Sequence, residues 1–372
     1  MSYWLVQGHQ SMTFDARRNQ AYAEALEKII TPESVVLDLG AGLGIHGLLA
    51  AKLGAKRVYL VEPEDIISLT DKIVQANGYS ARIHCLQGKI EEINLPEKVD
   101  VIISVFTGNF LLEEDLLPSL FYARDKYLKP GGVLIPQAAV MEAVPVSAPE
   151  LYEKNIACWS EPHMEIDHSP ARAFASQSIY YREDLKKARY LAAPASLLTL
   201  DFHEANSTHC ESEVKYTVTE SGLCHGFAGW FKMQLGDTWL STAPHEPPLH
   251  WSAAFLPLDP PIYLEAGEEV TFKLQRPLYG DWTWQVKNNT TQQVRSTFLG
   301  APRSIKTIKK LGLNYQPQIN EKGKAALYVL SHCDGSLSVE ELSHYIVKDF
   351  PNLFSDSRQA TKFVQGLVGR FS

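Results

Sequence analysis

The sequence predicts an α/β domain, followed by a β domain and a small helical domain. A length of 372 residues is enough for two or three domains of roughly 100 to 200 residues each. Between residues 21 and 144, apolar runs of strand length alternate with helical patterns, which is typical of a doubly wound, mostly parallel sheet. After Pro136, apolar residues alternate along short runs bounded by glycine, proline, aspartate and asparagine, as in antiparallel sheets.

The expected elements of the first domain follow one another as helix and strand. The helical patterns cover residues 22–30, 45–53, 70–77 and 114–127. The strand patterns cover residues 35–39, 57–61, 83–86, 99–104 and 133–136. Parallel strands separated by helices predict a Rossmann-like domain, which binds cofactors at the carboxyl ends of its strands.

The rest of the chain separates into a β domain and a helical domain. Antiparallel strand patterns cover residues 214–218, 226–234, 270–274 and 282–286. A more helical segment at about 152–193 predicts an arm inserted into this β-barrel-like domain. A basic stretch at 302–310 leads to helical patterns at 321–333 and 358–371, and between them Ser338 and Glu341 form a capping box. We therefore expect domains at 1–140, 141–305 and 306–372, the last resembling a small winged helix.

Composition excludes several classes of protein. Hydrophobic residues make up 45% and charged residues 21%, so a disordered or fibrous chain is excluded. A formal charge of −8 argues against a general affinity for nucleic acid. The five cysteines form no CxxC pair, and His332 with Cys333 has no second ligand pair, so we expect a reducing cytoplasm and no metal. We expect neither export nor a membrane span, because no signal peptide and no run of about 20 apolar residues occurs.

A glycine-rich turn follows the first expected strand. The strand runs into three glycines, Gly40, Gly42 and Gly44, which let the backbone approach a ligand at the next helix. The turn formally satisfies the dinucleotide fingerprint, with Glu62 twenty positions after Gly42 as a ribose-binding acid. Asp38 favours S-adenosylmethionine instead, because its carboxylate would attract an ammonium group and repel a pyrophosphate. A nicotinamide oxidoreductase stays open as an alternative.

Four residues near the N-terminus occur at a spacing of three: His9, Met12, Asp15 and Arg18. Together with the glycine turn, this pattern resembles the protein arginine methyltransferases, and the resemblance covers residues 3 to 300. It implies a helix that closes over S-adenosylmethionine, with His9 and Met12 touching the cofactor. It also implies that Arg18 pairs with the methionine carboxylate of the cofactor and that Asp15 lies beside the target nitrogen.

Further motifs extend the resemblance through both large domains. Glu62 matches the family's ribose-binding acid, and Glu91 matches its adenine-binding acid. Residues 249–251 resemble the Thr-His-Trp loop, with leucine in place of threonine. The resemblance implies that His250 hydrogen-bonds Asp15 and that the tryptophan beside it, Trp251, walls the substrate pocket. It also implies a head-to-tail homodimer, in which the arm docks onto the partner's cofactor domain.

One departure from the family concerns the substrate. The family holds a guanidinium between two glutamates, but here Val105 stands in place of the first, and Glu114 aligns with the second. Losing one of two buried carboxylates typically costs about 3 to 5 kcal/mol, so a neutral or less highly charged nitrogen would fit better than arginine. Thr107 and Asn109 could bind an amide, or serve only the turn around Gly108.

The expected function is an S-adenosylmethionine-dependent N-methyltransferase that acts on a side-chain nitrogen of a protein or peptide. Glu114 would orient the nucleophile, and Asp15 with His250 would accept its proton. Residues 332–342 resemble the small peptide-chaperone domains of ribosomal-peptide modification systems, which implies a last domain that holds a leader peptide. The alternative class, motivated by Val105, is a catalytically silent interaction protein that binds the cofactor.

Overall fold

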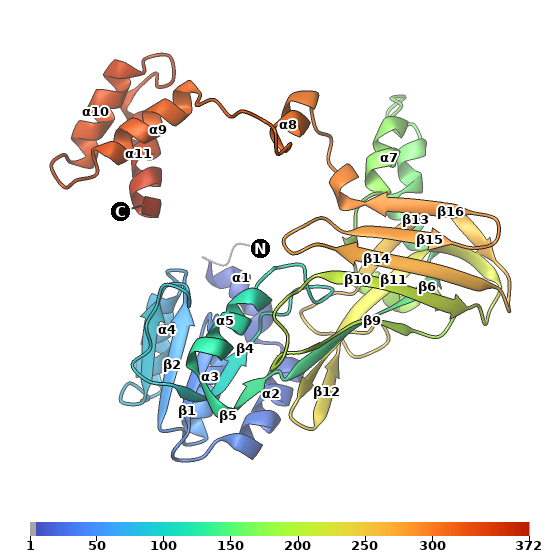
Figure 1. Cartoon of the computed structure of the whole chain (residues 1–372), viewed down its shortest axis with the longest axis horizontal. Helices are drawn as coiled ribbons and strands as arrows, with labels where there is room; N and C mark the ends of the chain where they lie inside the picture. The colour runs from blue at the N-terminus through green and yellow to red at the C-terminus, as the bar shows by residue number, and fades with distance from the viewer. Residues whose placement is uncertain (1–4, 372) are drawn as a thin grey trace. The chain divides into compact units, whose positions relative to one another are not determined.

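The computed structural model describes residues 5–371, and the chain divides into two compact units, residues 1–302 and 303–372 (Figure 1). The expected domains at 1–140 and 306–372 also include residues 1–4 and 372, which lie outside the described residues. The first unit contains a parallel sheet and two antiparallel sheets. The α/β and β parts of the predicted fold class are therefore confirmed.

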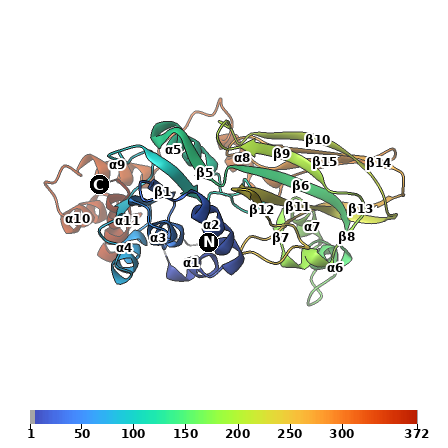
Figure 2. The same cartoon turned by 90° about the horizontal axis from the view of Figure 1, so that it is seen from below.

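The parallel sheet has five strands in the order β3-β2-β1-β4-β5. The strands are β1 (Val35–Leu39), β2 (Arg57–Glu62), β3 (Ile83–Gln87), β4 (Val99–Ser104) and β5 (Leu128–Ile135). The helices of this region are α1 (Val6–Thr13), α2 (Ala16–Ile29), α3 (Ile45–Lys52), α4 (Ile67–Ala76) and α5 (Leu117–Tyr127). All five residues of β1 are buried, as expected for a central strand covered by helices on both faces (Figure 2). The strand order reverses at β1, which opens a crevice between the carboxyl ends of β1 and β4.

Two helices begin elsewhere than the sequence pattern predicts. Helix α2 starts at Ala16, earlier than the expected residue 22, because the Asp15 side chain caps it by accepting a hydrogen bond from the backbone of Arg18. Helix α5 starts at Leu117, later than the expected residue 114, because the preceding loop holds Asp115 at a φ of 54°. A left-handed backbone cannot continue a right-handed helix, so the loop extends to the start of α5.

The antiparallel region consists of a seven-stranded sheet and a four-stranded sheet. The first contains β6 (Ala138–Ser147), β7 (Tyr180–Tyr181), β8 (Arg189–Tyr190), β9 (Ala195–Asp201), β11 (Gly222–Leu235), β12 (Thr238–Ser241) and β13 (Ala254–Leu264). The second contains β10 (Cys210–Thr217), β14 (Glu269–Arg276), β15 (Thr283–Lys287) and β16 (Gln292–Ser296). Strand β6 directly follows β5 along the chain, so the expected boundary after residue 140 falls inside β6. One hydrophobic core continues from the parallel sheet into the antiparallel region.

The expected arm lies between β6 and β9, where β7 and β8 alternate with short helices. The short helices are α6 (Pro149–Asn155), η1 (Ala157–Ser160), η2 (Ser169–Ala171), α7 (Arg172–Ala175) and η3 (Glu183–Lys187). A further short helix, η4 (Thr297–Leu299), ends the first unit. Within residues 5–371, no helix is long and apolar enough to span a membrane.

The described part of the second unit consists of helices joined by loops. It comprises α8 (Ile305–Lys310), α9 (Glu321–Ser331), α10 (Val339–Asp349) and α11 (Ser357–Phe371). The predicted capping box is present, since Ser338 and Glu341 exchange hydrogen bonds at the start of α10. Residues of α9, α10 and α11 form a separate small core. The winged-helix prediction is not met, because a wing requires a β-hairpin and residues 303–371 contain no strand.

Candidate active site

The glycine turn lies between β1 and α3, at the crevice of the parallel sheet. Gly40 and Gly42 have φ angles of 68° and 53°, which favour glycine. A Cβ atom on Gly40 would lie 2.3 Å from the Phe106 ring, and one on Gly42 would lie 2.9 Å from Nδ1 of His9. The turn therefore needs glycine both for its backbone conformation and for the close approach of its neighbours.

Two carboxylates flank this turn. Asp38 at the end of β1 accepts a hydrogen bond of 2.8 Å from the backbone N–H of Gly47. Burial raises the pKa of Asp38 to about 7, and the nearby charge of Glu62 adds to this effect. Glu62 at the end of β2 accepts a hydrogen bond of 2.9 Å from Gly42, and burial raises its pKa as well. Both carboxyl groups are costly to ionise without a partner, so a ligand with a cation and hydroxyl donors would suit them.

The helices α1 and α2 bring three further predicted residues to the same crevice. His9 and Met12 belong to α1, and Arg18 belongs to α2. Arg18 is buried, and its Nη2 donates a hydrogen bond to the carbonyl oxygen of Met12. Burial lowers the pKa of the Arg18 guanidinium, against the opposing effect of nearby acidic groups. A buried guanidinium that keeps its charge is a suitable partner for a carboxylate.

These elements enclose a pocket of about 420 Å³. Nine of the predicted site residues line it: His9, Met12, Arg18, Asp38, Gly40, Gly42, Glu62, Val105 and Glu114. Gly44 caps the start of α3 from the glycine turn and does not line the pocket. Glu91 also lies away from it, since its exposed side chain accepts a hydrogen bond of 2.5 Å from the Ser119 hydroxyl. This contact could not be predicted from the sequence pattern, because it depends on α5 packing beside the loop that follows β3.

Asp15 and His250 form a buried pair, as the family resemblance implied. The backbone N–H and Nδ1 of His250 each lie 2.9 Å from Oδ2 of Asp15. Burial alone would raise the pKa of Asp15, but hydrogen bonds from His250 and Arg18 outweigh it and hold this pKa below its usual value. Burial lowers the pKa of His250, and Asp15 offsets this only in part. The arrangement therefore favours a neutral imidazole whose Nδ1–H donates to Asp15.

This pair does not itself line the pocket in the described part of the chain. It reaches the pocket through Arg18, whose backbone N–H donates a hydrogen bond of 3.0 Å to Asp15. Trp251 is also buried behind the lining, with its ring centroid 3.8 Å from that of His250. The guanidinium of Arg18 lies 6.0 Å from the Trp251 ring.

The loop between β4 and α5 brings Val105 and Glu114 to the pocket together. Gly108 makes this possible, because a Cβ atom there would lie 2.8 Å from Cγ of Glu114. Thr107 and Asn109, which the sequence offers as candidates for binding an amide, do not line the pocket. Thr107 is buried, and Oδ1 of Asn109 accepts a hydrogen bond of 3.0 Å from the backbone of Ser252. The burial of Thr107 and the hydrogen bond of Asn109 favour the alternative, a role in the turn around Gly108.

His46 also lines the pocket, although the sequence does not predict it as a site residue. Its ring stacks on Tyr22 with the centroids 4.2 Å apart. Burial, Arg18 and His250 all lower its pKa, so the ring is neutral at physiological pH. The sequence shows only a lone histidine in an otherwise apolar stretch of α3. Such a residue is as typical of a packed core as of a binding site.

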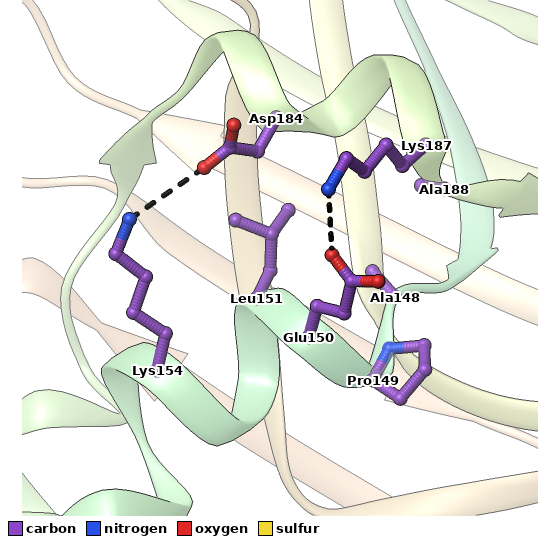
Figure 3. A pocket seen from close by; sticks show the side chains of 8 residues that line it. All are labelled: Ala148, Pro149, Glu150, Leu151, Lys154, Asp184, Lys187 and Ala188. Carbon is purple, nitrogen blue, oxygen red and sulfur yellow. Dashed lines mark hydrogen bonds and ion pairs between the residues drawn. The ribbon is translucent and has the colours of Figure 1, made fainter.

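A second hollow, of about 320 Å³, lies between α6 and η3 (Figure 3). Its charged side chains form two ion pairs, Lys154 with Asp184 at 3.6 Å and Lys187 with Glu150 at 2.9 Å. These ion pairs satisfy the charges of the hollow, unlike the buried carboxylates of the pocket described above. Within residues 5–371, no group of three or more histidine, cysteine, aspartate or glutamate side chains could hold a metal ion.

Comparison with known proteins identifies the family. The arginine methyltransferase oligomerization subdomain matches residues 137–278, and a methyltransferase domain matches residues 36–132. Protein arginine N-methyltransferase 6 of Xenopus laevis is 33% identical over 279 residues, which cover 71% of this chain and 81% of that protein. The chain belongs to the protein arginine methyltransferases. The predicted family is thus confirmed, and neither domain match extends into the second unit.

Other members of the family show the extent of the similarity. Protein arginine N-methyltransferase 2 of Xenopus tropicalis is 32% identical over 73% of this chain, and the match spans 66% of that relative's length. The Trypanosoma brucei PRMT1 enzyme-prozyme heterotetrameric complex with AdoHcy has a TM-score of 0.74 and 27% identity, covering 80% of this chain and 99% of that chain. Arabidopsis thaliana protein arginine methyltransferase 10 shares the fold, with a TM-score of 0.69 over 80% of this chain and 99% of its own.

Proposed function

We propose that this chain is an S-adenosylmethionine-dependent N-methyltransferase that acts on a side-chain nitrogen of a protein or peptide. The observation that carries the proposal is that Glu114 lines the same pocket as Arg18, Asp38 and Glu62. One cavity thus combines groups suited to an amino acid and a ribose with a carboxylate suited to a nitrogen nucleophile. A nicotinamide cofactor fits less well, because the buried Asp38 would repel its pyrophosphate.

The chain's own residues fit the cofactor. Arg18 would pair with its methionine carboxylate, Asp38 with its ammonium group, and Glu62 with its ribose hydroxyls. His9 and Met12 would cover it from α1. When bound, S-adenosylmethionine supplies an activated methyl group on a sulfonium. Catalysis by the protein then depends mainly on positioning the nucleophile and accepting its proton.

Glu114 would hold the substrate nitrogen and orient its lone pair. Asp15 holds Nδ1–H of His250, which leaves Nε2 of the imidazole to accept a proton. We propose this pair as the proton acceptor. An acceptor must be neutral before the proton arrives, and burial lowers the pKa of His250 and so favours its neutral form. As the N–C bond forms and the sulfonium C–S bond breaks, the nitrogen would release its proton. Because the pair does not line the pocket, the proton would be relayed to it rather than passed on directly.

Val105 bears on the substrate class. A guanidinium in this pocket would meet Glu114 but no second carboxylate at position 105. We propose that the preferred nucleophile is neutral or less highly charged, such as an amide, an imidazole or an amine. Arginine remains the substrate named for the relatives, and the peptide experiment below includes it.

The remaining proposals concern assembly. The oligomerization subdomain spans the arm, and we propose a homodimer in which the arm docks onto the partner's cofactor domain. We also propose that the last domain, expected at 306–372, holds part of a peptide substrate. The resemblance of residues 332–342 to peptide-chaperone domains supports this role. We propose the cytoplasm as the location of the protein.

The test is mass spectrometry of labelled methyl transfer to a peptide library that presents each nitrogen-bearing side chain. We expect one residue type to be methylated by the wild-type chain and far less by Glu114→Gln, which keeps the size of the side chain and removes its charge. Calorimetry with S-adenosylhomocysteine supplies the control, since cofactor binding should survive the substitution. Cofactor binding without transfer to any peptide would favour the second candidate, the silent interaction protein that Val105 suggests.

A further inference from the structure

We propose that a groove between α9 and α11 binds an acidic segment of the peptide substrate. This inference rests on the proposed function and adds the chemistry of the segment that lies away from the methylated residue. The groove is a hollow of about 460 Å³ within the second unit. Its apolar surface comes from Ala326, Phe363 and Leu367, beside the backbone of Gly323 and Gly366.

The charges around the groove are all of one sign. Lys322, Lys362 and Arg370 line it, and no aspartate or glutamate does. In the described part of the chain, none of these three cations forms an ion pair. The ammonium group of Lys322 lies 5.9 Å from the Phe363 ring, so positive charge sits directly beside the apolar surface.

The composition of the second unit agrees with an acidic partner. Residues 303–372 contain ten lysines and arginines against six aspartates and glutamates, whereas the whole chain contains 35 against 43. The positive charge is therefore concentrated in a chain that is negative overall. Such a field attracts a polyanionic segment and repels a basic one.

The size and lining of the groove specify the ligand more closely. An apolar surface flanked by cations fits a segment in which apolar and acidic side chains alternate in space, such as one face of an amphipathic helix. A second peptide-binding point away from the active site raises the local concentration of substrate at the catalytic pocket. The occupant we infer is thus the recognition segment of the substrate peptide.

Two glycines of α11 provide a matched pair of variants. A Cβ atom would meet nothing within 4 Å at either Gly366 or Gly369, but only Gly366 lines the groove. Gly366→Leu should fill the groove, while Gly369→Leu adds the same side chain to the same helix outside it. Both changes replace a helical glycine with a better helix former, so neither should unfold the unit.

The experiment measures fluorescence anisotropy of the full chain with two labelled peptides. The first repeats Leu-Glu-Glu, and the second has lysine in place of each glutamate. We expect saturable binding of the acidic peptide alone, weakened roughly tenfold by the Lys322→Glu/Lys362→Glu pair and by Gly366→Leu. Gly369→Leu and Lys348→Glu, which alter side chains outside the groove, should leave binding unchanged. Circular dichroism confirms that each variant is folded.

The outcomes separate this inference from the proposed function. Equal binding of the two peptides, or acidic-peptide binding that survives the groove variants, would overturn the groove proposal while leaving methyl transfer untouched. Loss of binding in Gly366→Leu together with normal S-adenosylhomocysteine affinity would support it. Methyl transfer to short library peptides is measured without the acidic segment, so a failure of that assay concerns the catalytic pocket alone.

Discussion

Asp38 is the residue whose protonation should set the pH dependence of cofactor binding. Burial raises its pKa to about 7, so in the ligand-free protein a large fraction of this carboxyl group is protonated at neutral pH. An ammonium group pairs only with the ionised form. We therefore expect S-adenosylhomocysteine affinity to rise roughly tenfold per pH unit below 7 and to level off above it.

Calorimetry at a series of pH values tests this expectation, with Asp38→Asn as the variant that cannot titrate. The same raised pKa predicts how the stability of the folded protein changes with pH. Burial makes the ionised form unfavourable in the folded protein. The free energy of unfolding is therefore highest below the usual Asp pKa of 3.8 and falls as the pH rises from there to about 7. An affinity that is flat between pH 6 and pH 8 would contradict the assignment of Asp38 to the ammonium group.

Val105 is the residue that should decide whether arginine is accepted. Val105→Glu places a second carboxylate in the pocket that Glu114 lines, so we expect arginine peptides to bind at least roughly tenfold more tightly. The control is Val105→Gln, which has a similar shape and no charge. Calorimetry compares an arginine peptide with one that carries citrulline, its neutral isostere. If both variants bind arginine as the wild type does, our account of the substrate class is wrong.

At the scale of elements, the sequence predicts the parallel sheet well and the catalytic loop poorly. The strands at 35–39 and 99–104 form as predicted, because apolar runs of that length have few alternatives in a covered sheet. The loop between β4 and α5 could not be predicted from local pattern, since positive φ angles at Phe110, Leu111 and Asp115 are maintained by distant contacts. Trp282 packs against Phe110, and Arg276 pairs with Asp115, each from more than 60 positions away along the chain.

Separation along the chain also explains which site residues could be predicted from the sequence. The glycine turn and the spacing of His9 to Arg18 are local patterns, and the structure brings these residues to one pocket. The contact of Glu91 with Ser119 and that of Asn109 with Ser252 depend on tertiary packing. No local pattern contains that information, so the roles assigned to Glu91 and Asn109 stay predictions that their contacts do not favour.

The two acidic neighbours of Glu114 should act as positioning residues for it. Asp115 forms a bidentate ion pair with Arg276 of β14, at 2.7 and 2.8 Å. Glu113 accepts hydrogen bonds of 2.6 Å from the Tyr181 hydroxyl and 3.1 Å from Nε1 of Trp282. The antiparallel region thus holds the loop on both sides of the residue that lines the pocket.

Replacing Arg276 tests this role. Removing one partner of a buried ion pair lowers the free energy of unfolding by about 3 to 5 kcal/mol. Because Asp115 is partly exposed, we expect about the lower figure for Arg276→Ala. We expect methyl transfer to lose kcat while S-adenosylhomocysteine affinity is kept, with partial recovery in Arg276→Lys. Lys215→Ala breaks an exposed ion pair with Glu269, another residue of β14, and should change neither. Equal losses of cofactor binding and kcat would indicate general unfolding instead.

At the scale of the whole molecule, the arm exposes several large apolar side chains within one short segment. Met164 and Ile166 are 80% and 58% exposed, and Trp159 and Phe174 are also exposed. Apolar side chains gathered on one short segment mark a protein–protein contact more often than an isolated exposed residue does. The segment lies inside the matched oligomerization subdomain, so a second copy of this chain is the partner we propose.

Charged substitutions in the arm should therefore dissociate the dimer. We expect light scattering after gel filtration to give twice 41.6 kDa for the wild type and 41.6 kDa for Met164→Asp/Ile166→Asp, because two carboxylates would be buried without partners at the contact. Leu223→Asp changes an exposed apolar residue of β11 outside the arm and should remain dimeric. Dimers that persist in the double variant would show that another surface joins the subunits, and a monomeric wild type would reject the homodimer itself.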